Sequence, residues 1–296
     1  MKNVSVIGAG TMGNGIAHVF AMHGFDVTLI DVDALALERG MNTISRNLDR
    51  MLAKEKISAQ DRADTLARLR SLSNLAEGVS AADLVVEAAT ERVDLKLQIF
   101  AQLDGAAPAH AILASNTSSI SITRIAAATK RPGQVIGMHF MNPVPVMKLV
   151  EVIRGYATTD AVTSSVMSLS RTLGKDPVEV RDFPGFVANR ILMPMINEAI
   201  ISLHEGVAGV AEIDTVMKLG MAHPMGPLQL ADFIGLDVCL SILKVLHDGL
   251  GNPKYAPCPL LVNMVTAGKL GAKSGEGFYA YGSDGKAGLP APAFSR

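Results

Sequence analysis

The chain has 296 residues, a length that suggests roughly two domains. It is 49% hydrophobic and 19% charged, so it can bury a large core and does not have the composition of a disordered chain. A net charge of −1 gives no global field for nucleic acid or membranes, and aromatic residues at 4% without tryptophan disfavour a base-stacking surface. No uninterrupted apolar run reaches the roughly 20 residues of a membrane span.

The two cysteines give no sign of a metal or redox site. Cys239 and Cys258 lie 258 − 239 = 19 positions apart, which matches neither a zinc-ligand pattern nor a CxxC motif. We therefore expect no metal and two reduced thiols, as in a cytoplasmic protein. The N-terminus begins with a strand-like run at 4–7 rather than a signal peptide, which also favours the cytoplasm.

The first thirty residues carry the strongest local pattern. An apolar run at 4–7 predicts a strand, and a glycine-rich turn follows at 8–13. Apolar residues then recur at helical spacing, and a second strand is predicted at 25–30, ending in Asp31. Strand, GxGxxG turn, helix, strand and acid in this order are typical of a Rossmann dinucleotide-binding unit.

Each part of this unit has a physical role. Gly8 allows the tight turn, Gly10 lets the backbone approach a pyrophosphate, and Gly13 lets the helix pack close to the strand. The helix N-terminus, which begins around Thr11 and Met12, supplies free N–H donors for the phosphates. Asp31, 31 − 13 = 18 positions after the last glycine, suits the ribose hydroxyls and repels a 2′-phosphate, as does Asp33. The pattern favours NAD over NADP, with FAD the lesser rival and a Gly-rich turn without nucleotide the remaining alternative.

A long helical stretch at about 34–70 follows and predicts an inserted helical hairpin, because an ordinary crossover helix is shorter. Arg46, Arg50 and Lys54 form a basic stripe at i, i+4 and i+8 along it. A solvated helix face explains such a stripe, and so does a site for an anionic group of the substrate.

The alternation of strands and helices then resumes. Strands are predicted at 84–89, 111–114, 135–140, 149–153 and 178–180, and helices at about 93–104 and 161–173. Ligands of such sheets bind beyond the carboxyl ends of the strands. Four polar residues fall there and are expected to face nicotinamide and substrate: Glu91, Asn116, Ser118 and His139.

The pattern changes at 182–185, which predicts a domain boundary. We expect a mostly parallel, doubly wound α/β domain over 1–183 and an all-helical domain over 184–296. Helices are predicted at about 186–206, 211–219, 227–248 and 257–268. Pro194 predicts a kink in the first of them, 271–277 reads as a flexible loop, and residues after about 282 read as a loose tail.

His139 and Glu151 form the candidate chemical pair. A proline-rich turn separates their strands and can bring the two side chains together, so that the carboxylate fixes the tautomer of the imidazole and makes it a better base. Such a base can take a proton from a substrate hydroxyl, while Ser118 and Asn189 offer neutral donors to the same oxygen. A structural histidine, a helix cap at Ser118 and an ordinary helix-face amide at Asn189 are the alternatives, whereas a carboxylate in an apolar strand needs a partner.

Several longer runs resemble the L-3-hydroxyacyl-CoA dehydrogenase family, in particular its short bacterial 3-hydroxybutyryl-CoA dehydrogenases. These runs span nearly the whole chain in family order: GAGTMGNGIA (8–17), ATER (89–92), SNTSS (115–119), HFMNPVPVMKLVEV (139–152), PGFVANR (184–190), HPMGPLQLADFIGLD (223–237) and GEGFY (275–279).

The resemblance implies roles for individual residues. His139 is implied as the acid/base, Glu151 as its partner, and Ser118 and Asn189 as residues that position the substrate oxygen. Nicotinamide-side roles are implied for Glu91, Lys96, Asn116, Asn142 and Lys273. The helical insertion is implied to hold the CoA nucleotide. Lys54 matches a basic residue of the family there, and Arg50 is the second basic residue expected to contact it. A serine of animal relatives is Asn47 here, so that CoA contact does not carry over.

The implied activity is NAD-dependent interconversion of (S)-3-hydroxyacyl-CoA and 3-oxoacyl-CoA, with short-chain substrates, by a homodimer joined through its helical domains. Two other functions stay open. One is another Rossmann-plus-helical oxidoreductase of sugar acids or 2-hydroxy acids, although those enzymes mostly use a lysine base. The other is a non-catalytic NAD-binding protein, which could have lost the four polar residues of the site without penalty.

Overall fold

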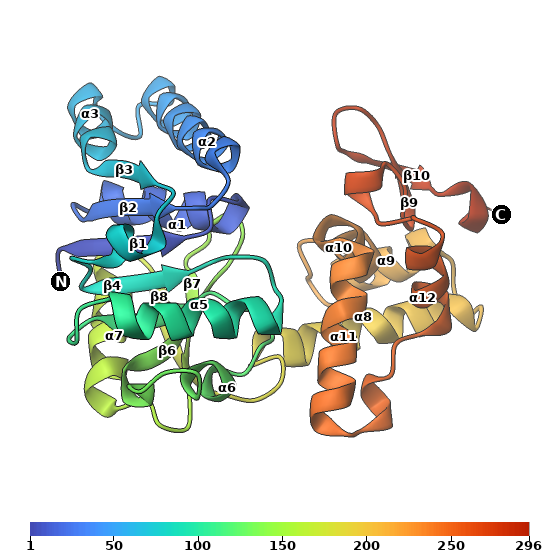
Figure 1. Ribbon diagram of the computed structural model, residues 1–296. Coiled ribbons are helices and arrows are strands. Elements are labelled where there is room, and N and C mark those ends of the chain that lie inside the picture. The colour runs from blue at the N-terminus through green and yellow to red at the C-terminus, as the bar shows by residue number, and fades with distance from the viewer. Residues whose placement is uncertain (296) are drawn as a thin grey trace. The chain divides into compact units, whose positions relative to one another are not determined.

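The computed structural model describes residues 1–295, which divide into two compact units, residues 1–183 and the residues from Pro184 onward. Each unit has its own hydrophobic core. We describe each unit by itself (Figure 1). Within the described residues, no helix has both the length and the apolar character needed to cross a membrane.

The first unit is built on one eight-stranded sheet. Its strands, in the order β3-β2-β1-β4-β5-β6-β7-β8, are β3 (Leu69–Leu72), β2 (Asp26–Ile30), β1 (Asn3–Ile7), β4 (Leu84–Glu87), β5 (Ile112–Ser115), β6 (Val135–Phe140), β7 (Leu149–Arg154) and β8 (Asp176–Arg181). Neighbouring strands run parallel except for the β6–β7 pair, which is antiparallel. The expected mostly parallel α/β sheet is therefore confirmed. The chain leaves β1 toward β2 and later returns to β4 on the other side of β1, which is the switch point where such sheets bind ligands.

Helices connect the strands of this sheet. They are α1 (Thr11–Met22), α2 (Ala34–Ala53), α3 (Ala59–Ala67), α4 (Leu75–Val79), α5 (Val93–Ala106), α6 (Ile122–Ala126) and α7 (Asp160–Thr172), with a 3₁₀ turn at Pro132–Gln134. Helix α1 is buried from Gly13 to Ala21, because it is covered by the sheet on one side and by α2 and α3 on another. In Figure 1, α2 and α3 stand as a pair beside the edge strand β3.

The insertion at 34–70 differs from the expectation at its end. It contains α2 and α3, but Leu69 already belongs to strand β3, which the sequence reading missed. In β3, at the sheet edge, the two end residues are half-buried and the two middle ones, Arg70 and Ser71, are exposed, so the strand lacks the apolar run of a central strand. Helices α4 and α6 were also missed, since five residues are too few to show a helical period.

The second unit is helical, as expected. Its helices are α8 (Ala188–His204), α9 (Val210–Gly220), α10 (Pro227–Ile234), α11 (Leu236–Leu250) and α12 (Pro259–Thr266), with 3₁₀ turns at Pro253–Tyr255, Ala272–Ser274 and Pro292–Phe294. Its core is mainly aliphatic and includes Ile196, Leu228, Leu236, Leu243 and Leu246. Pro194 lies inside α8, which runs unbroken past it.

Two expectations for this unit were wrong. The helix expected at 227–248 is two helices, because Gly235 at φ +103° ends α10 and starts α11 on a new axis. The tail expected to be loose after 282 carries β10 (Ala287–Pro290), which pairs antiparallel with β9 (Tyr279–Tyr281). The ring of Phe294 also packs on Phe278, with centroids 5.8 Å apart, so apolar contacts order this segment despite its polar, glycine-rich composition.

Candidate active site

In the glycine-rich turn after β1, two of the three glycines leave no room for a side chain. Gly8 has φ +96°, and a Cβ there would lie 2.6 Å from the carbonyl oxygen of Ala88. A Cβ on Gly13 would lie 1.7 Å from the carbonyl oxygen of Gly8, whereas Gly10 faces open space. Helix α1 starts at Thr11 with no side-chain cap and no acidic residue in its first turn. Its N–H groups thus remain available for an anion such as a pyrophosphate.

Asp31 lies beside this turn at the carboxyl end of β2. One carboxylate oxygen accepts from the N–H of Ala9 at 2.8 Å and the other from the N–H of Asp33 at 3.0 Å, so its position is fixed by the backbone. A cavity of about 340 Å³ adjoins it, lined among others by Gly8, Ala89 and Thr90. The cavity, the carboxylate and the open helix end fit the adenosine and phosphate parts of NAD.

His139 and Glu151 are direct partners across the antiparallel strands β6 and β7. The Nδ1 atom of His139 lies 2.8 Å from Oε2 of Glu151, and both side chains are buried. Because an ionised carboxylate only accepts, Nδ1 carries the hydrogen, and the neutral ring offers Nε2 as a proton acceptor. The predicted pairing of these two residues is thus present in the structure.

A buried lysine holds the loop that joins these two strands. The ammonium of Lys175 donates to the carbonyl oxygens of Val144 at 2.6 Å and Met147 at 2.8 Å. Desolvation by burial lowers the pKa of Lys175. The sequence reading missed this residue, because a lysine next to a predicted strand carries no local signal of a distant loop contact.

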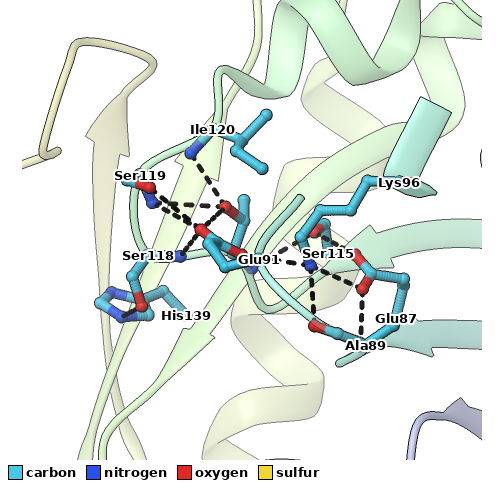
Figure 2. A network of polar contacts seen from close by, with 10 residues as sticks. Glu87, Ala89, Glu91, Lys96, Ser115, Ser118, Ser119, Ile120 and His139 are labelled. Carbon is cyan, nitrogen blue, oxygen red and sulfur yellow. Dashed lines mark hydrogen bonds and ion pairs between the residues drawn. The ribbon is translucent and has the colours of Figure 1, made fainter. Parts of the chain in front are cut away.

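Ser118 lies on the loop after β5 and faces the histidine. Its hydroxyl oxygen is 3.0 Å from Nε2 of His139 (Figure 2). Glu151 binds the other ring nitrogen, Nδ1. The tautomer set by Glu151 makes the hydroxyl the donor of this bond. Ser118, His139 and Glu151 therefore form one hydrogen-bonded line at the carboxyl ends of β5 and β6.

Glu91 holds the same loop from the other side, as Figure 2 shows. Its Oε1 accepts from the backbone N–H groups of Ser118 at 3.0 Å and Ser119 at 3.2 Å, and from the hydroxyl of Ser119 at 3.1 Å. The hydroxyl of Thr117 also donates to this oxygen. The structure brings Glu91, Ser118 and His139 together, as the strand-end positions predict.

Lys96 and Glu87 form a fully buried ion pair behind Glu91. The Lys96 ammonium lies 2.6 Å from Oε1 of Glu87 and 3.2 Å from Oε2 of Glu91. Lys96 is 1% exposed and Glu87 is not exposed at all. The sequence reading missed Glu87, although a carboxylate within the apolar strand predicted at 84–89 is the same signal that pointed to Glu151.

The two asparagines near the strand ends differ in their surroundings. Asn116 is buried, and its side-chain oxygen accepts from the N–H of Phe140 at 2.9 Å, which ties the loop after β5 to the end of β6. Asn142 is exposed on the loop after β6. Asn116 thus braces the site, while Asn142 lies at the surface of the same edge.

The basic residues of the insertion lie apart from this group of side chains. Arg50 is in the last turn of α2, Lys54 is its C-cap, and both are exposed. Arg46, one turn earlier, lines a shallow depression of about 350 Å³ with Arg39, Asn42 and Ser45. The stripe is therefore a solvent-facing basic surface that can meet an anion.

Asn189 and Lys273 belong to the second unit. Asn189 is in the first turn of α8. Lys273 lies in the turn Ala272–Ser274, where its ammonium is 2.5 Å from Oδ1 of Asp237.

Two buried aspartates, which the sequence reading missed, organise the surroundings of that turn. Asp214 accepts from the N–H groups of Leu228 at 2.9 Å and Gln229 at 3.0 Å and so caps α10. Asp232 accepts from Phe278 and Tyr279 N–H, both at 2.9 Å. Desolvation raises the pKa of Asp232 to about 6. The runs around 223–237 and 275–279 are thus joined by these carboxylates.

A nucleotide cradle and a proton acceptor at one edge of a parallel sheet are the two parts that an NAD-dependent dehydrogenase needs. Two family models match the chain: "3-hydroxyacyl-CoA dehydrogenase, NAD binding domain" over residues 3–183, and "3-hydroxyacyl-CoA dehydrogenase, C-terminal domain" over residues 185–281. The protein therefore belongs to the 3-hydroxyacyl-CoA dehydrogenase family and is an NAD-dependent enzyme, as the sequence resemblance implied.

Individual relatives cover almost the whole chain. A probable 3-hydroxybutyryl-CoA dehydrogenase of Bacillus subtilis is 56% identical over 95% of this chain and 98% of its own. The mitochondrial hydroxyacyl-coenzyme A dehydrogenase of Rattus norvegicus is 46% identical over 95% and 91% of the two chains. The crystal structure of (S)-3-hydroxybutyryl-CoA dehydrogenase from Ralstonia eutropha matches with a TM-score of 0.93 and 50% identity, covering 96% of this chain and all of the other.

Proposed function

We propose that this enzyme interconverts (S)-3-hydroxybutyryl-CoA and acetoacetyl-CoA, with His139 as its acid/base. The observation that carries the proposal is the line Glu151–His139–Ser118, with bonds of 2.8 and 3.0 Å, at the sheet edge that also holds the NAD cradle. The short acyl chain is taken from the names of the bacterial relatives.

The residues of the site account for the proton. In the oxidation, Nε2 of His139 takes the proton of the substrate hydroxyl, and the carboxylate of Glu151 stabilises the imidazolium that forms. In the reduction, the imidazolium returns that proton to the developing alkoxide. The hydroxyl of Ser118 and the amide of Asn189 are proposed as donors that orient the same oxygen; when substrate is bound, Ser118 turns its one hydrogen from Nε2 of His139 to that oxygen.

NAD, when bound, accepts the hydride from the carbon that bears the hydroxyl. The backbone of Gly8, Gly10, Thr11, Met12 and Gly13 is proposed to hold its pyrophosphate, and Asp31 its adenosine ribose. Nicotinamide-side roles are proposed for Glu91, Asn116, Asn142 and Lys273, among which Glu91 and Asn116 border the Ser118–His139 pair.

The CoA part of the substrate carries phosphates, which need cations. Arg50 and Lys54 are exposed, lie one helical turn apart on α2, and are proposed to bind them. Replacing both by glutamine is expected to raise the KM for acetoacetyl-CoA with little change in kcat, because the phosphates lie far from the reacting carbon.

The test of the activity is NADH oxidation with acetoacetyl-CoA by the wild type and by His139→Ala. Turnover is expected in the wild type, with a fall of roughly 10²–10⁴-fold in the variant for the loss of a general acid. Free acetoacetate and a set of sugar acids and 2-hydroxy acids serve as control substrates. Equal or faster turnover of a control substrate would overturn the acyl-CoA proposal, and so would an inactive wild type that still binds NADH.

We also propose that the active form is a homodimer joined through the helical units. Large apolar side chains are exposed on α8, α9 and α10, where Ile191 is 68%, Leu219 83% and Phe233 62% accessible. A second copy of the same surface can cover them. Size-exclusion chromatography with light scattering measures the molar mass of the wild type and of Phe233→Glu. We expect a dimer for the wild type and a shift toward monomer for the variant. A monomeric wild type would contradict it.

The cytoplasm is the proposed compartment. Cys239 and Cys258 are both free and buried, which suits a reducing environment. Fractionation of the source cells with an antibody to this chain tests the assignment, and recovery outside the cytoplasm would contradict it.

A further inference from the structure

We infer that Glu87, through its buried ion pair with Lys96, is a positioning residue that sets the place of the Ser118 hydroxyl beside His139. The inference rests on the proposed function, in which Ser118 and His139 handle the substrate oxygen. It follows from a continuous set of contacts drawn in Figure 2.

Glu87 is the anchor of this network. It is the last residue of β4, has no exposed surface, and stands opposite Ser115 in the parallel pair β4–β5. Its Oε1 accepts from the Lys96 ammonium at 2.6 Å and the Ala89 N–H at 2.7 Å, and its Oε2 accepts from the Ser115 hydroxyl at 2.7 Å. Three donors from three segments thus converge on one carboxylate.

Three oxygen atoms surround the ammonium of Lys96. It donates to Oε1 of Glu87 at 2.6 Å and to the carbonyl oxygen of Ala89 at 3.3 Å, and it forms an ion pair with Oε2 of Glu91 at 3.2 Å. It is also 1% exposed. Besides the nicotinamide-side role that the family resemblance implies, Lys96 thus holds Glu91 and the loop after β4.

Glu91 links Lys96 to the loop after β5, which contains Ser118. While Lys96 holds Oε2, Oε1 accepts from the N–H groups of Ser118 and Ser119 and from the hydroxyls of Thr117 and Ser119. A second branch runs from Glu87 through the Ser115 hydroxyl, which accepts from the N–H of Thr117 at 3.2 Å. The first branch thus reaches Thr117, Ser118 and Ser119, and the second reaches Thr117, so both hold the segment that carries the Ser118 hydroxyl.

The buried charges of Glu87 and Lys96 are not explained by folding stability alone. Burying an ion pair costs desolvation that its attraction barely offsets, and apolar side chains of similar volume pack as well or better. Charged groups with convergent hydrogen bonds do fix geometry, because each bond restrains both distance and direction. The network lies beside the hydrogen bond between the Ser118 hydroxyl and Nε2 of His139, and the proposed chemistry depends on the geometry of that bond.

The test compares Glu87→Gln with Asp104→Asn. Asp104 pairs with Arg131 at 3.0 Å near the other end of α5, 104 − 96 = 8 residues or about 12 Å from Lys96, so its loss reports general damage to the same unit. We expect Glu87→Gln to lower kcat at least about tenfold, with the KM values for NADH and acetoacetyl-CoA within about threefold of wild type. The isotope effect with NADH deuterated at the transferred position should rise in Glu87→Gln only.

Hydrogen exchange of the peptide that covers 115–120 gives a readout without activity. Faster exchange of the Ser118 and Ser119 amides is expected in Glu87→Gln and not in Asp104→Asn, even if acetoacetyl-CoA proves to be the wrong substrate. If Glu87→Gln does not fold, Ser115→Ala cuts the second branch and should show the same changes at smaller size. Equal kcat, isotope effect and exchange in the tested variant and Asp104→Asn would overturn the inference.

Discussion

His139 and Glu151 face each other across β6 and β7 as register partners, with 2.8 Å between Nδ1 and Oε2. The pair lies in the one antiparallel step of the sheet, so both side chains point to the same face at the same height. Side chains that are directly opposite in this way need no loop to bring them together. The strands themselves hold the carboxylate on the imidazole.

Glu151→Gln should therefore impair catalysis without unfolding the sheet. Glutamine keeps the size of the side chain and an oxygen acceptor for Nδ1–H, but it removes the charge that stabilises the imidazolium. We expect kcat to fall by roughly 10–10³-fold, with a smaller change in the KM for acetoacetyl-CoA. Steady-state kinetics over a pH series measures this.

The matched control is Glu179→Gln, an exposed carboxylate on the next strand, β8. It should leave kcat within about twofold of the wild-type value, because the ion pair of Glu179 with Arg154, at 3.7 Å, lies at the surface and contributes little. Wild-type kcat in Glu151→Gln would show that the carboxylate serves packing only.

Cofactor choice should depend on Asp31 more than on Asp33. The Asp31 carboxylate borders the 340 Å³ cavity, whereas Asp33 has Arg39 at 3.4 Å, which offsets part of its charge. Asp31→Ser is expected to lower kcat/KM for NADH and raise it for NADPH, a combined shift of about tenfold or more, because a carboxylate repels a 2′-phosphate. Asp33→Ser keeps the N-cap of α2 and should shift the ratio less. An unchanged ratio in Asp31→Ser would contradict this assignment.

The parts of the fold that follow from sequence are those with strong periodicity. The central strands were predicted because burial on both faces of a parallel strand demands an apolar run. The long helices were predicted from apolar residues at helical spacing, and the glycine-rich turn from its GxGxxG pattern. Strand β3 and helices α4 and α6 were not, since four or five residues show no period. The break at Gly235 was not predicted either, because a glycine within an apolar helical pattern does not by itself show that its φ is +103°.

The site divides in the same way. His139, Glu151 and Ser118 were predicted because polar residues at strand ends are few and their chemistry is recognisable. Glu87 and Lys175 were not, because each acts on a segment that only the fold brings near: Glu87 on Ser115 and Lys96, and Lys175 on the loop after β6. Residues that hold other residues leave little pattern along the chain.

Gly277→Ala should destabilise the second unit. A Cβ there would lie 1.9 Å from Oδ1 of Asp232, the carboxylate that accepts from the Phe278 and Tyr279 N–H groups. Displacing it leaves buried donors unpaired, so we expect a loss of at least about 2 kcal/mol in the free energy of unfolding. Gly220→Ala, where the added Cβ meets nothing within 4 Å, is the control and should be neutral or slightly stabilising. Equal melting temperatures for the two variants would show that the Asp232 loop yields without cost.

His18 should make the first unit sensitive to acid. It lies on α1 with no exposed surface, and neither ring nitrogen has a hydrogen-bond partner among the described residues. Burial lowers the pKa of His18 from 6.5 to about 4. The unfolded chain therefore binds a proton at this residue before the folded one does, so stability is full above pH 6.5 and is lost as the pH falls toward 4. Between pH 7 and pH 5 the loss amounts to about 2 kcal/mol.

The measurement is urea unfolding of wild type and His18→Leu at these two pH values. Leucine fills a similar volume without titrating, so the variant should lose about 2 kcal/mol less than the wild type over this range. Asp232, whose pKa is raised to about 6 by burial, is common to both proteins, so its contribution cancels in the difference. His204→Gln, an exposed site at the end of α8, should follow the wild type. If His18→Leu keeps the full acid sensitivity, the folded protein must protonate His18 as readily as the unfolded chain, through a rearrangement that opens the α1 surface to water.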